Sequence, residues 1–359
     1  MKSNALIYCE NEFGKVDGKV ANGLVRQSDT YNIIGIIDST KSGLDAGEYL
    51  EGIKNGIPIF ESIETALKKL NSVPNSFIYG IAPITSFLNE IHRKIILTAI
   101  KSGMNIVNGL PEFFNEDEQF TNAALTYGVT IRDIRKPPKR ENLHNFSGRI
   151  RDIKTPTVTV MGTDCAVGKR TSALLLVNAL KKEGLNVVFI TTGQTGLLQG
   201  SNYGIAVDVL ASGYASGEVE NAILQACKTE DPDIIIVEGQ GALGHPGFTS
   251  SSAIIRGAMP DAIIIQHPPK RKNYCDYPNI PMTTLEEEIK MVEIFSKSKV
   301  IAITINHENM STTEVNDIIN TYESKYNLPT TDVLQHGCDK LVKALLMTFP
   351  KLKRESALL

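Results

Sequence analysis

The sequence predicts an α/β protein with two parallel, doubly wound sheets, one in each half of the chain. The first observation is its length: 359 residues exceed one ordinary core and suggest two domains. The second is that short apolar runs rich in β-branched residues alternate with helical patterns in both halves. The third is a basic, proline-containing stretch over residues 133–156 that interrupts this alternation.

The N-terminal half is predicted to be a Rossmann-like domain over residues 1–140. The expected helices cover residues 18–28, 62–70 and 86–103, the last ending at Gly103 as a C-cap. Asp38 ends the second expected strand, where a dinucleotide-binding fold contacts a ribose, but Gly-x-Gly-x-x-Gly is missing before it, which disfavours NAD. The strands are expected at 5–9, 32–39, 56–60, 76–82 and 104–110.

Residues 141–156 are predicted to be a linker, and residues 157–359 to form the second domain. Helices over 313–327 and 338–349 are expected to close the chain. Strands alternating with helices again favour a parallel sheet. Its strands are expected at 157–161, 187–192, 234–238, 262–266 and 299–305.

Composition excludes several classes of function. A formal charge of -3 provides no general attraction to nucleic acid or to an anionic membrane surface. The five cysteines are scattered without CxxC spacing, which argues against a disulfide framework or a zinc site and favours a cytoplasmic protein. The chain also lacks a signal peptide pattern and an apolar run approaching the ~20 residues of a membrane span. We therefore expect a small-molecule substrate, without nucleic-acid or membrane partners.

A glycine-rich turn between the strand "VTVM" and the helical pattern "TSALLLVNAL" resembles a phosphate-binding loop, Gly-x4-Gly-Lys-[Ser/Thr]. Gly162, Gly168 and Lys169 are interpreted as its glycines and lysine, which would hold a phosphate at a helix N-terminus. Arg170 takes the position of the hydroxyl that binds magnesium. Either Thr171 replaces that hydroxyl, or no metal is bound and Arg170 neutralises a phosphate or a carboxylate. The predicted cofactor-binding residues are Gly162, Thr163, Asp164, Cys165, Ala166, Val167, Gly168, Lys169, Arg170 and Thr171.

Polar residues follow two other expected strands, and carboxyl ends of parallel strands meet at one edge of a sheet. Gln194 lies in the turn after residues 187–192, and Glu238 ends the strand 234–238. His245 follows in a glycine-rich loop. A carboxylate directly after four apolar residues would be costly to bury unpaired, so Glu238 is the first candidate for a catalytic role.

A series of short motifs occurs in a fixed order along the chain: "GKVANGLVR", "GIIDST", "YGIAP", "IRDIRKPP", "MGTDCAVGKRTSALLL", "TTGQTG", "VEGQGALGHPGF" and "MPDAIIIQHPPKR". In these motifs the sequence resembles a bacterial P-loop family with a Rossmann-like N-terminal domain, whose best-understood member acetylates D-glutamate with acetyl-CoA. The resemblance spans most of residues 1–280, and its most specific parts are residues 162–171 and 238–247. More distantly, "GTDCAVGK" and "VEGQGAL" are similar to dethiobiotin synthetase.

The resemblance implies a P-loop NTPase-like C-terminal domain and an N-acetyltransferase in which the loop holds phosphates of acetyl-CoA rather than a nucleotide to be split. The amine of a D-amino acid, expected to be D-glutamate, would attack the thioester. Glu238 is then the candidate base, with Gln194 and His245 beside it. Arg256 or Arg271, besides Arg170, would bind substrate carboxylates. No metal is expected, and the N-terminal domain is expected to cover the site or to form a homo-oligomer interface.

Two other functions remain open at this stage. An ATP- and magnesium-dependent ligase or kinase similar to dethiobiotin synthetase would use Thr171 and Glu238 at the metal. A nucleotide sensor would use the loop to switch a domain interface. Departures from the family motif at 84–86, 111 and 213–214 also leave open an acceptor other than D-glutamate.

Overall fold

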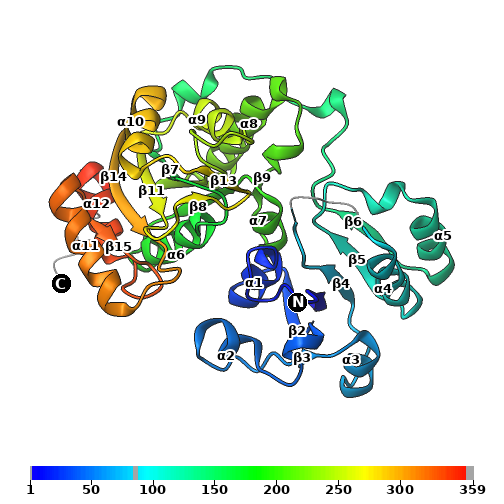
Figure 1. The fold of residues 1–359 in the computed structure, drawn as a ribbon. Coiled ribbons are helices and arrows are strands. Elements are labelled where there is room, and N and C mark those ends of the chain that lie inside the picture. Colours follow the sequence, from blue (N-terminus) through cyan, green and yellow to red (C-terminus); the bar gives the residue numbers. More distant parts are fainter. Residues whose placement is uncertain (1, 84–87, 353–359) are drawn as a thin grey trace, which may run out of the picture. The chain divides into compact units, whose positions relative to one another are not determined.

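The computed structural model describes residues 2–83 and 88–352 and contains two compact units (Figure 1). The first unit comprises Met1–Pro137 together with Gln194–Ser201, and the second comprises Pro138–Gly193 and Asn202–Leu359. The family-motif departure at 84–86 lies outside the described residues. Each unit has its own parallel sheet, so the predicted fold class is confirmed.

The first unit is a parallel sheet of six strands in the order β3-β2-β1-β4-β5-β6. All five predicted strands are present, and the sheet also gains β6. The helix predicted over 86–103 begins at Glu90, and Gly103 follows its end at φ +85°. The elements are β1 Ser3–Tyr8, α1 Lys19–Arg26, β2 Tyr31–Ile37, α2 Ala46–Glu51, β3 Ile59–Phe60, α3 Ile63–Lys69, β4 Ser76–Tyr79, α4 Glu90–Lys101, β5 Asn105–Asn108, α5 Glu118–Tyr127 and β6 Ile131–Asp133.

Asp38 has a structural role in this unit. Its side chain is fully buried, and its carboxylate accepts hydrogen bonds from the backbone N–H groups of Phe13 and Thr40. The Lys41 ammonium lies 2.8 Å from the same carboxylate. The oxygens that would contact a ribose in a dinucleotide-binding domain therefore close the loop after β2 instead.

A short helix from the middle of the chain, α7 (Gln194–Gln199), completes the first unit. Leu198 is buried in the core of that unit. The Gln199 side-chain amide donates hydrogen bonds to the backbone oxygens of Gly23 and Gln27, at 2.9 and 3.0 Å. These contacts were not predicted, because the sequence pattern of 194–201 alone does not show which sheet the segment joins.

The second unit is a parallel sheet of seven strands in the order β15-β14-β11-β7-β10-β8-β9. All five predicted strands are present, with short additional strands at both edges. Its elements are β7 Thr157–Gly162, α6 Lys169–Lys182, β8 Val187–Thr191, β9 Tyr203–Gly204, α8 Ser212–Glu230, β10 Ile234–Glu238, α9 Ser250–Ala258, β11 Ala262–His267, α10 Leu285–Ser296, β14 Lys299–Ile305, α11 Thr312–Tyr326, β15 Thr330–Thr331 and α12 Asp339–Thr348, besides an antiparallel hairpin of β12 Asn273–Tyr274 and β13 Tyr277–Pro281.

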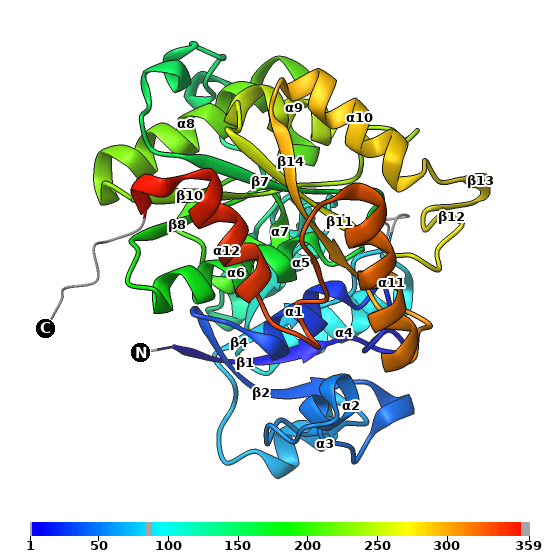
Figure 2. The same ribbon diagram turned by 90° about the vertical axis from the view of Figure 1, so that its left-hand side faces the viewer.

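Helices cover both faces of this sheet (Figure 2). On the central strand β7, Val158 and Val160 pack against α6 and α12, whereas Met161 packs with α10 and α11 on the other face. The alternation follows from the two-residue period of a strand. Because both faces are covered, β7 is buried along its whole length, and the functional groups lie in the loop after its carboxyl end.

Residues 141–156, which we expected to be a linker, pack against α8. The carboxylate of Glu220, only 1% exposed, accepts hydrogen bonds from the backbone N–H groups of Ser147 (2.6 Å) and Ile150 (3.1 Å). Glu218 accepts in the same way from His144 N–H, at 2.5 Å. Two buried carboxylates thus order a segment that has little apolar periodicity of its own.

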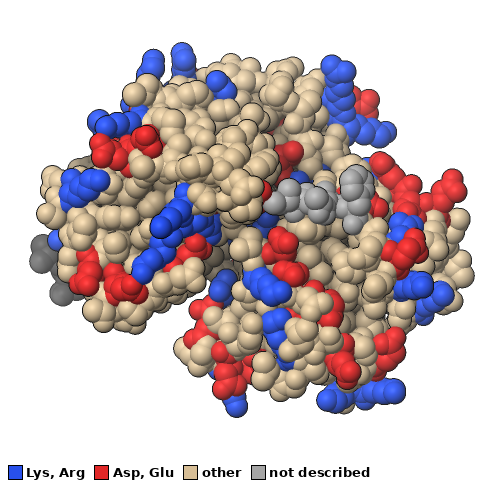
Figure 3. Space-filling view, in the orientation of Figure 1, with Lys and Arg blue, Asp and Glu red and all other residues tan. Residues whose placement is uncertain are grey.

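Among the described residues, no helix is both long enough and apolar enough to span a membrane. On the face shown in Figure 3, acidic and basic side chains are interspersed. This agrees with the small formal charge of the chain.

Candidate functional site

The loop between β7 and α6 has the local geometry of a phosphate-binding loop with one more residue. Five residues, 163–167, separate Gly162 from Gly168, where the standard motif has four. Gly168 has φ +103°, which a glycine adopts without strain. A Cβ added to Gly162 would lie 3.0 Å from Lys169 Cδ, so the loop closes tightly over β7. The loop has the predicted shape, but its two glycines are one residue further apart than in the Gly-x4-Gly motif.

Lys169 is the first residue of α6, after the loop that follows the central strand β7, and it is almost completely buried. Its ammonium donates hydrogen bonds to the backbone oxygens of Asp164 and, at 2.9 Å, of Gly241. Burial lowers the pKa of Lys169. The N-cap Gly168 has no side chain to accept from the first amides of α6, so those amides and the ammonium suit an anion.

Asp164 is held by an ion-pair network rather than left for a ligand. Arg271 Nη1 lies 2.7 Å from Asp164 Oδ2, and the other side of the guanidinium forms a bidentate pair with Glu308, at 2.8 and 2.6 Å. Nη1 also donates to the Cys165 carbonyl oxygen. We expected Arg271 to bind a substrate carboxylate, but here protein carboxylates occupy it, and it ties the loop to the segments after β11 and β14.

The β12–β13 hairpin meets the same loop. The backbone N–H of Cys275 donates to Asp164 Oδ2 at 2.8 Å, and the Cys275 Sγ is 3.6 Å from the Cys165 carbonyl oxygen. The spacing of the sequence did not indicate this contact. The only signal in the sequence was that residues 268–278 directly follow a strand, β11, whose carboxyl end faces the loop.

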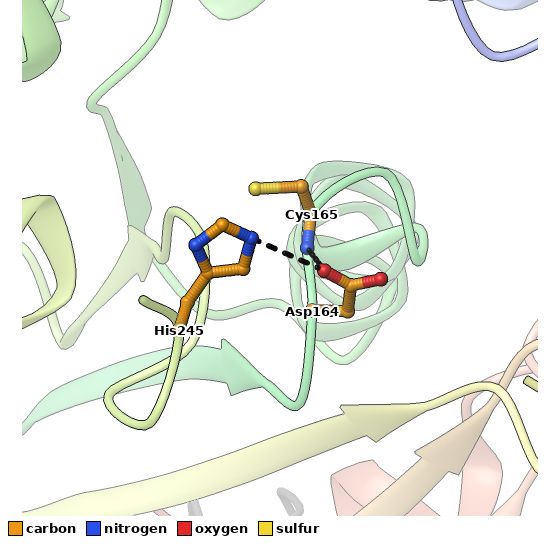
Figure 4. A group of neighbouring side chains, drawn as sticks. All are labelled: Asp164, Cys165 and His245. Carbon is orange, nitrogen blue, oxygen red and sulfur yellow. Dashed lines mark hydrogen bonds and ion pairs between the residues drawn. The ribbon is translucent and has the colours of Figure 1, made fainter. Parts of the chain in front are cut away.

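His245 approaches the loop from the turn after β10 (Figure 4). Its side chain is completely buried, and Nε2 lies 3.6 Å from Asp164 Oδ1. Aromatic rings enclose the imidazole, with ring centroids 4.9 Å away for Phe248 and 4.7 Å away for Tyr274. Asp164, Cys165 and His245, predicted from separate motifs, are therefore brought together.

These three residues offer one ligand atom each within 4.8 Å of one another, and a metal is the first possibility to test. The backbone N–H of Gly247 donates to His245 Nδ1 at 3.2 Å. Nδ1 is therefore an acceptor, and the proton of the neutral ring is on Nε2, the nitrogen that faces Asp164 and Cys165. A metal-binding histidine needs the opposite arrangement, with a lone pair toward the metal and an N–H on the other side. The donor set does not suit a metal.

Glu238 ends β10 beside the loop strand, in register with Val160 of β7. It is 6% exposed, and its Oε2 accepts hydrogen bonds from the Thr191 hydroxyl (2.5 Å) and the Thr192 N–H (3.1 Å). Thr192 also donates to the Glu238 carbonyl oxygen. One carboxylate oxygen thus orients the turn after β8, and the group lies close enough to Lys169 to interact with its charge.

Two other predicted residues are not in this cluster. Arg256 is exposed at the end of α9, which returns from the carboxyl edge of the sheet to its opposite edge, and its guanidinium stacks on Phe295 at 4.7 Å. The prediction of substrate binding ignored this direction of α9. Gln194 lies in the first unit, where its side chain approaches Gly109.

Arg170 and Thr171 occupy the first turn of α6 and are both half-buried. The hydroxyl of the next residue, Ser172, donates to Gln266 Oε1 at 2.5 Å, so it supports β11 rather than the loop. The position after Lys169 therefore carries a guanidinium, as the sequence indicated.

A cavity of about 850 Å³ lies between α6 and α12. Lys181, Lys182 and Glu183 line it, so it is at the opposite end of α6 from the loop. It is not part of the candidate site.

Because His267 is buried, we expect the stability of the folded protein to depend measurably on pH. It is buried at the end of β11, where Nδ1 lies 2.9 Å from the Thr163 hydroxyl, and burial together with Arg271 lowers its pKa to about 4. The unfolded chain, with an ordinary histidine pKa near 6.5, then binds more protons between about pH 6.5 and 4. Stability should therefore be complete above about pH 6.5 and fall by on the order of 3 kcal/mol as the pH drops to about 4.

Thermal unfolding of wild type and His267→Gln between pH 7 and pH 4.5 would test this. We expect the variant to show the smaller loss of melting temperature on acidification. Equal losses would mean that other groups carry the acid sensitivity.

Comparisons with known proteins agree with this architecture. Residues 39–137 match the model described as "Domain of unknown function (DUF1611_N) Rossmann-like domain", and residues 144–342 match "Domain of unknown function (DUF1611_C) P-loop domain". A crystal structure of a DUF1611 family protein from Anabaena variabilis is 29% identical, with a TM-score of 0.88 over 96% of this chain and 100% of that one.

Two relatives carry a name that states an activity. The "D-glutamate N-acetyltransferase" of Pseudoalteromonas sp. is 30% identical over 75% of this chain and 81% of its own length. That of Tritonibacter scottomollicae is 25% identical over 75% of this chain and 80% of its own.

Proposed function

Because the chain belongs to the DUF1611 family, with its Rossmann-like and P-loop domains, we propose that it is an acetyl-CoA-dependent N-acetyltransferase acting on a D-amino acid, in the first place D-glutamate. Residues 162–171 would hold phosphates of acetyl-CoA. The observation that carries the proposal is the pairing of an anion-binding loop with relatives that are named for acetyl transfer.

Three features of the loop support binding without cleavage of the phosphate group. The first amides of α6 and the Lys169 ammonium suit phosphate oxygens. Arg170 replaces the hydroxyl that would hold magnesium, and a guanidinium can neutralise a phosphate bidentately. The ligand is then anchored by charge, while the reaction takes place at its thioester end.

Acetyl transfer needs a neutral amine, and amino acids carry an ammonium near neutral pH. Glu238 is the proposed base, since it is buried beside the loop and the Thr191–Thr192 contacts hold one of its oxygens in place. A carboxylate in this position can accept the ammonium proton as the amine attacks. The backbone N–H groups of the turn after Glu238 are candidates to stabilise the oxyanion.

A ligase or kinase that uses ATP and magnesium is the second candidate. It is favoured by one observation, the carboxylate of Glu238 at the end of the strand next to β7, where a magnesium-associated carboxylate would lie. Arg170 argues against it.

Ligand-induced thermal stabilisation separates the two candidates. Acetyl-CoA at 100 times its dissociation constant should stabilise the folded protein by about 2.7 kcal/mol without added metal. The product of incubation with D-glutamate, L-glutamate or D-aspartate then identifies the acceptor. Stabilisation by ATP with magnesium, and not by acetyl-CoA, would transfer the chain to the ligase class.

Lys169→Met should abolish most of the stabilisation by acetyl-CoA, because the buried ammonium is lost while the apolar stem is retained. Lys181→Met, at the exposed far end of the same helix, is the matched control and should respond as wild type does. An undiminished shift in Lys169→Met would place the coenzyme elsewhere.

A further inference from the structure

The predicted phosphate loop contains a thiol, that of Cys165, which the proposed reaction does not yet use. Cys165 follows Asp164 in the loop, is half-buried, and has its Sγ within 4.8 Å of a ring nitrogen of His245 and of an Asp164 carboxylate oxygen (Figure 4). All the cysteines are free thiols. Cys165 thus combines partial access with a crowded polar environment, as reactive cysteines do.

The His245 ring carries an unpaired proton near this thiol. Since Nδ1 accepts the Gly247 N–H, the proton of the neutral ring is on Nε2. Within the described residues Nε2 makes no hydrogen bond, although the side chain is completely buried. A buried N–H without an acceptor is unfavourable, and an oxyanion formed between Cys165 and His245 would provide one.

The surrounding charges also favour the thiolate. The neighbouring Cys275 side chain, the contact with His245 and the charge of Lys169 lower the pKa of Cys165 to about 6, although burial and Asp276 oppose this. The Cys275 thiol points to the Cys165 carbonyl oxygen, at 3.6 Å, and the proximity of Cys165 together with burial raises the pKa of Cys275. The N-terminus of α6, four residues further along the chain, contributes partial positive charge.

We propose that Cys165 carries the acetyl group covalently between acetyl-CoA and the amino acid. The Cys165 thiolate attacks the thioester carbonyl, the carbon–sulfur bond to coenzyme A breaks, and the coenzyme A thiolate leaves and takes up a proton from water. The amine of the acceptor, after losing one ammonium proton to a base, then attacks the acetyl-cysteine. The carbon–sulfur bond to Cys165 breaks with the Cys165 thiolate as the leaving group, and the nitrogen gives up its second proton to water as the amide forms. One thioester replaces another, so no oxidant, reductant or further reactant is needed.

The proposal rests on the proposed function and assigns roles to two further residues. His245 Nε2–H stabilises the thiolate and then the oxyanion of each tetrahedral intermediate. Lys169 interacts with the charges of both Cys165 and Glu238, so the thiolate and the proposed base are both near its ammonium. The flexible pantetheine arm has to fold back toward the loop that holds the phosphates. Coenzyme A can leave before the acceptor arrives, which predicts ping-pong kinetics.

The test is incubation of the full-length protein with acetyl-CoA in the absence of any amino acid, followed by intact-protein and peptide mass spectrometry. We expect one acetyl group on Cys165 and its loss, with formation of N-acetyl-D-glutamate, when D-glutamate is added. Cys165→Ala and Cys165→Ser should not be labelled and should lose at least 100-fold in turnover while keeping the thermal shift with acetyl-CoA. Cys227→Ser is the matched control, because Cys227 is half-buried on α8 and burial raises its pKa.

A second measurement does not depend on acetyl-CoA. The rate of alkylation of Cys165 by iodoacetamide should have its midpoint near pH 6, and the midpoint should rise in His245→Phe. An alkylation midpoint near the pKa of a free cysteine would overturn the proposal that Cys165 is a thiolate at neutral pH.

The outcomes separate the two proposals. Acetyl transfer to D-glutamate without labelling of Cys165, or with full activity in Cys165→Ala, overturns the covalent step alone. Absence of both transfer and labelling overturns the proposed function as well. Labelling of Cys165 that D-glutamate does not discharge also overturns the covalent step, because the acetyl group is then a side product.

Discussion

Replacing Glu238 by glutamine should lower kcat for acetyl transfer by on the order of 10²- to 10⁴-fold, with little change in the KM for acetyl-CoA. The amide can keep the hydrogen bonds from the Thr191 hydroxyl and the Thr192 N–H, so the turn after β8 is retained. What is lost is the group that accepts the proton of the ammonium. Steady-state kinetics with D-glutamate as the varied substrate measures this effect.

The control for this substitution is Glu286→Gln, which removes an exposed carboxylate at the start of α10. Its kinetics should equal those of wild type. If Glu238→Gln retained wild-type kcat, Glu238 would be limited to orienting residues 191 and 192, and another group would have to accept the proton.

Arg271→Met should destabilise the second unit by about 3–5 kcal/mol, the cost of leaving a buried charge without its partner. Asp164 is fully buried, and the guanidinium lies 2.7 Å from its Oδ2 while pairing with Glu308 on its other side. Methionine retains a comparable apolar stem but none of these contacts. Chemical denaturation, followed by a probe of the second unit, measures the change.

Asp164→Asn in the Arg271→Met background should recover part of the lost stability, because the uncompensated carboxylate is removed. Lys290→Met, which breaks an exposed pair with Glu286 one helical turn away, should change stability by less than about 1 kcal/mol. If Arg271→Met also changed the free energy of unfolding by less than about 1 kcal/mol, the ion-pair network would hold the loop in place without contributing to stability.

The positions of several candidate residues were predictable because parallel strands bring their carboxyl ends together. A glycine turn before a helix and a carboxylate after a buried run placed Gly168, Lys169 and Glu238 at one edge of the sheet, and their roles stay predictions. The surroundings of Arg271 and Arg256 were not predictable, since the sequence does not show whether an arginine pairs with a protein carboxylate or is available to a ligand. Arg271 pairs with Asp164 and Glu308. Arg256 stacks on Phe295, because α9 runs to the opposite edge of the sheet.

The sequence by itself determined the two α/β halves, the phosphate loop and the strand ends that carry polar groups, because these depend on periodicities within about twenty residues. The tertiary structure decided which segments meet: α7 joins the first unit, the β12–β13 hairpin contacts the loop, and His245 lies beside Asp164 and Cys165. Such contacts depend on the register and packing of elements far apart in the chain, which no local pattern encodes.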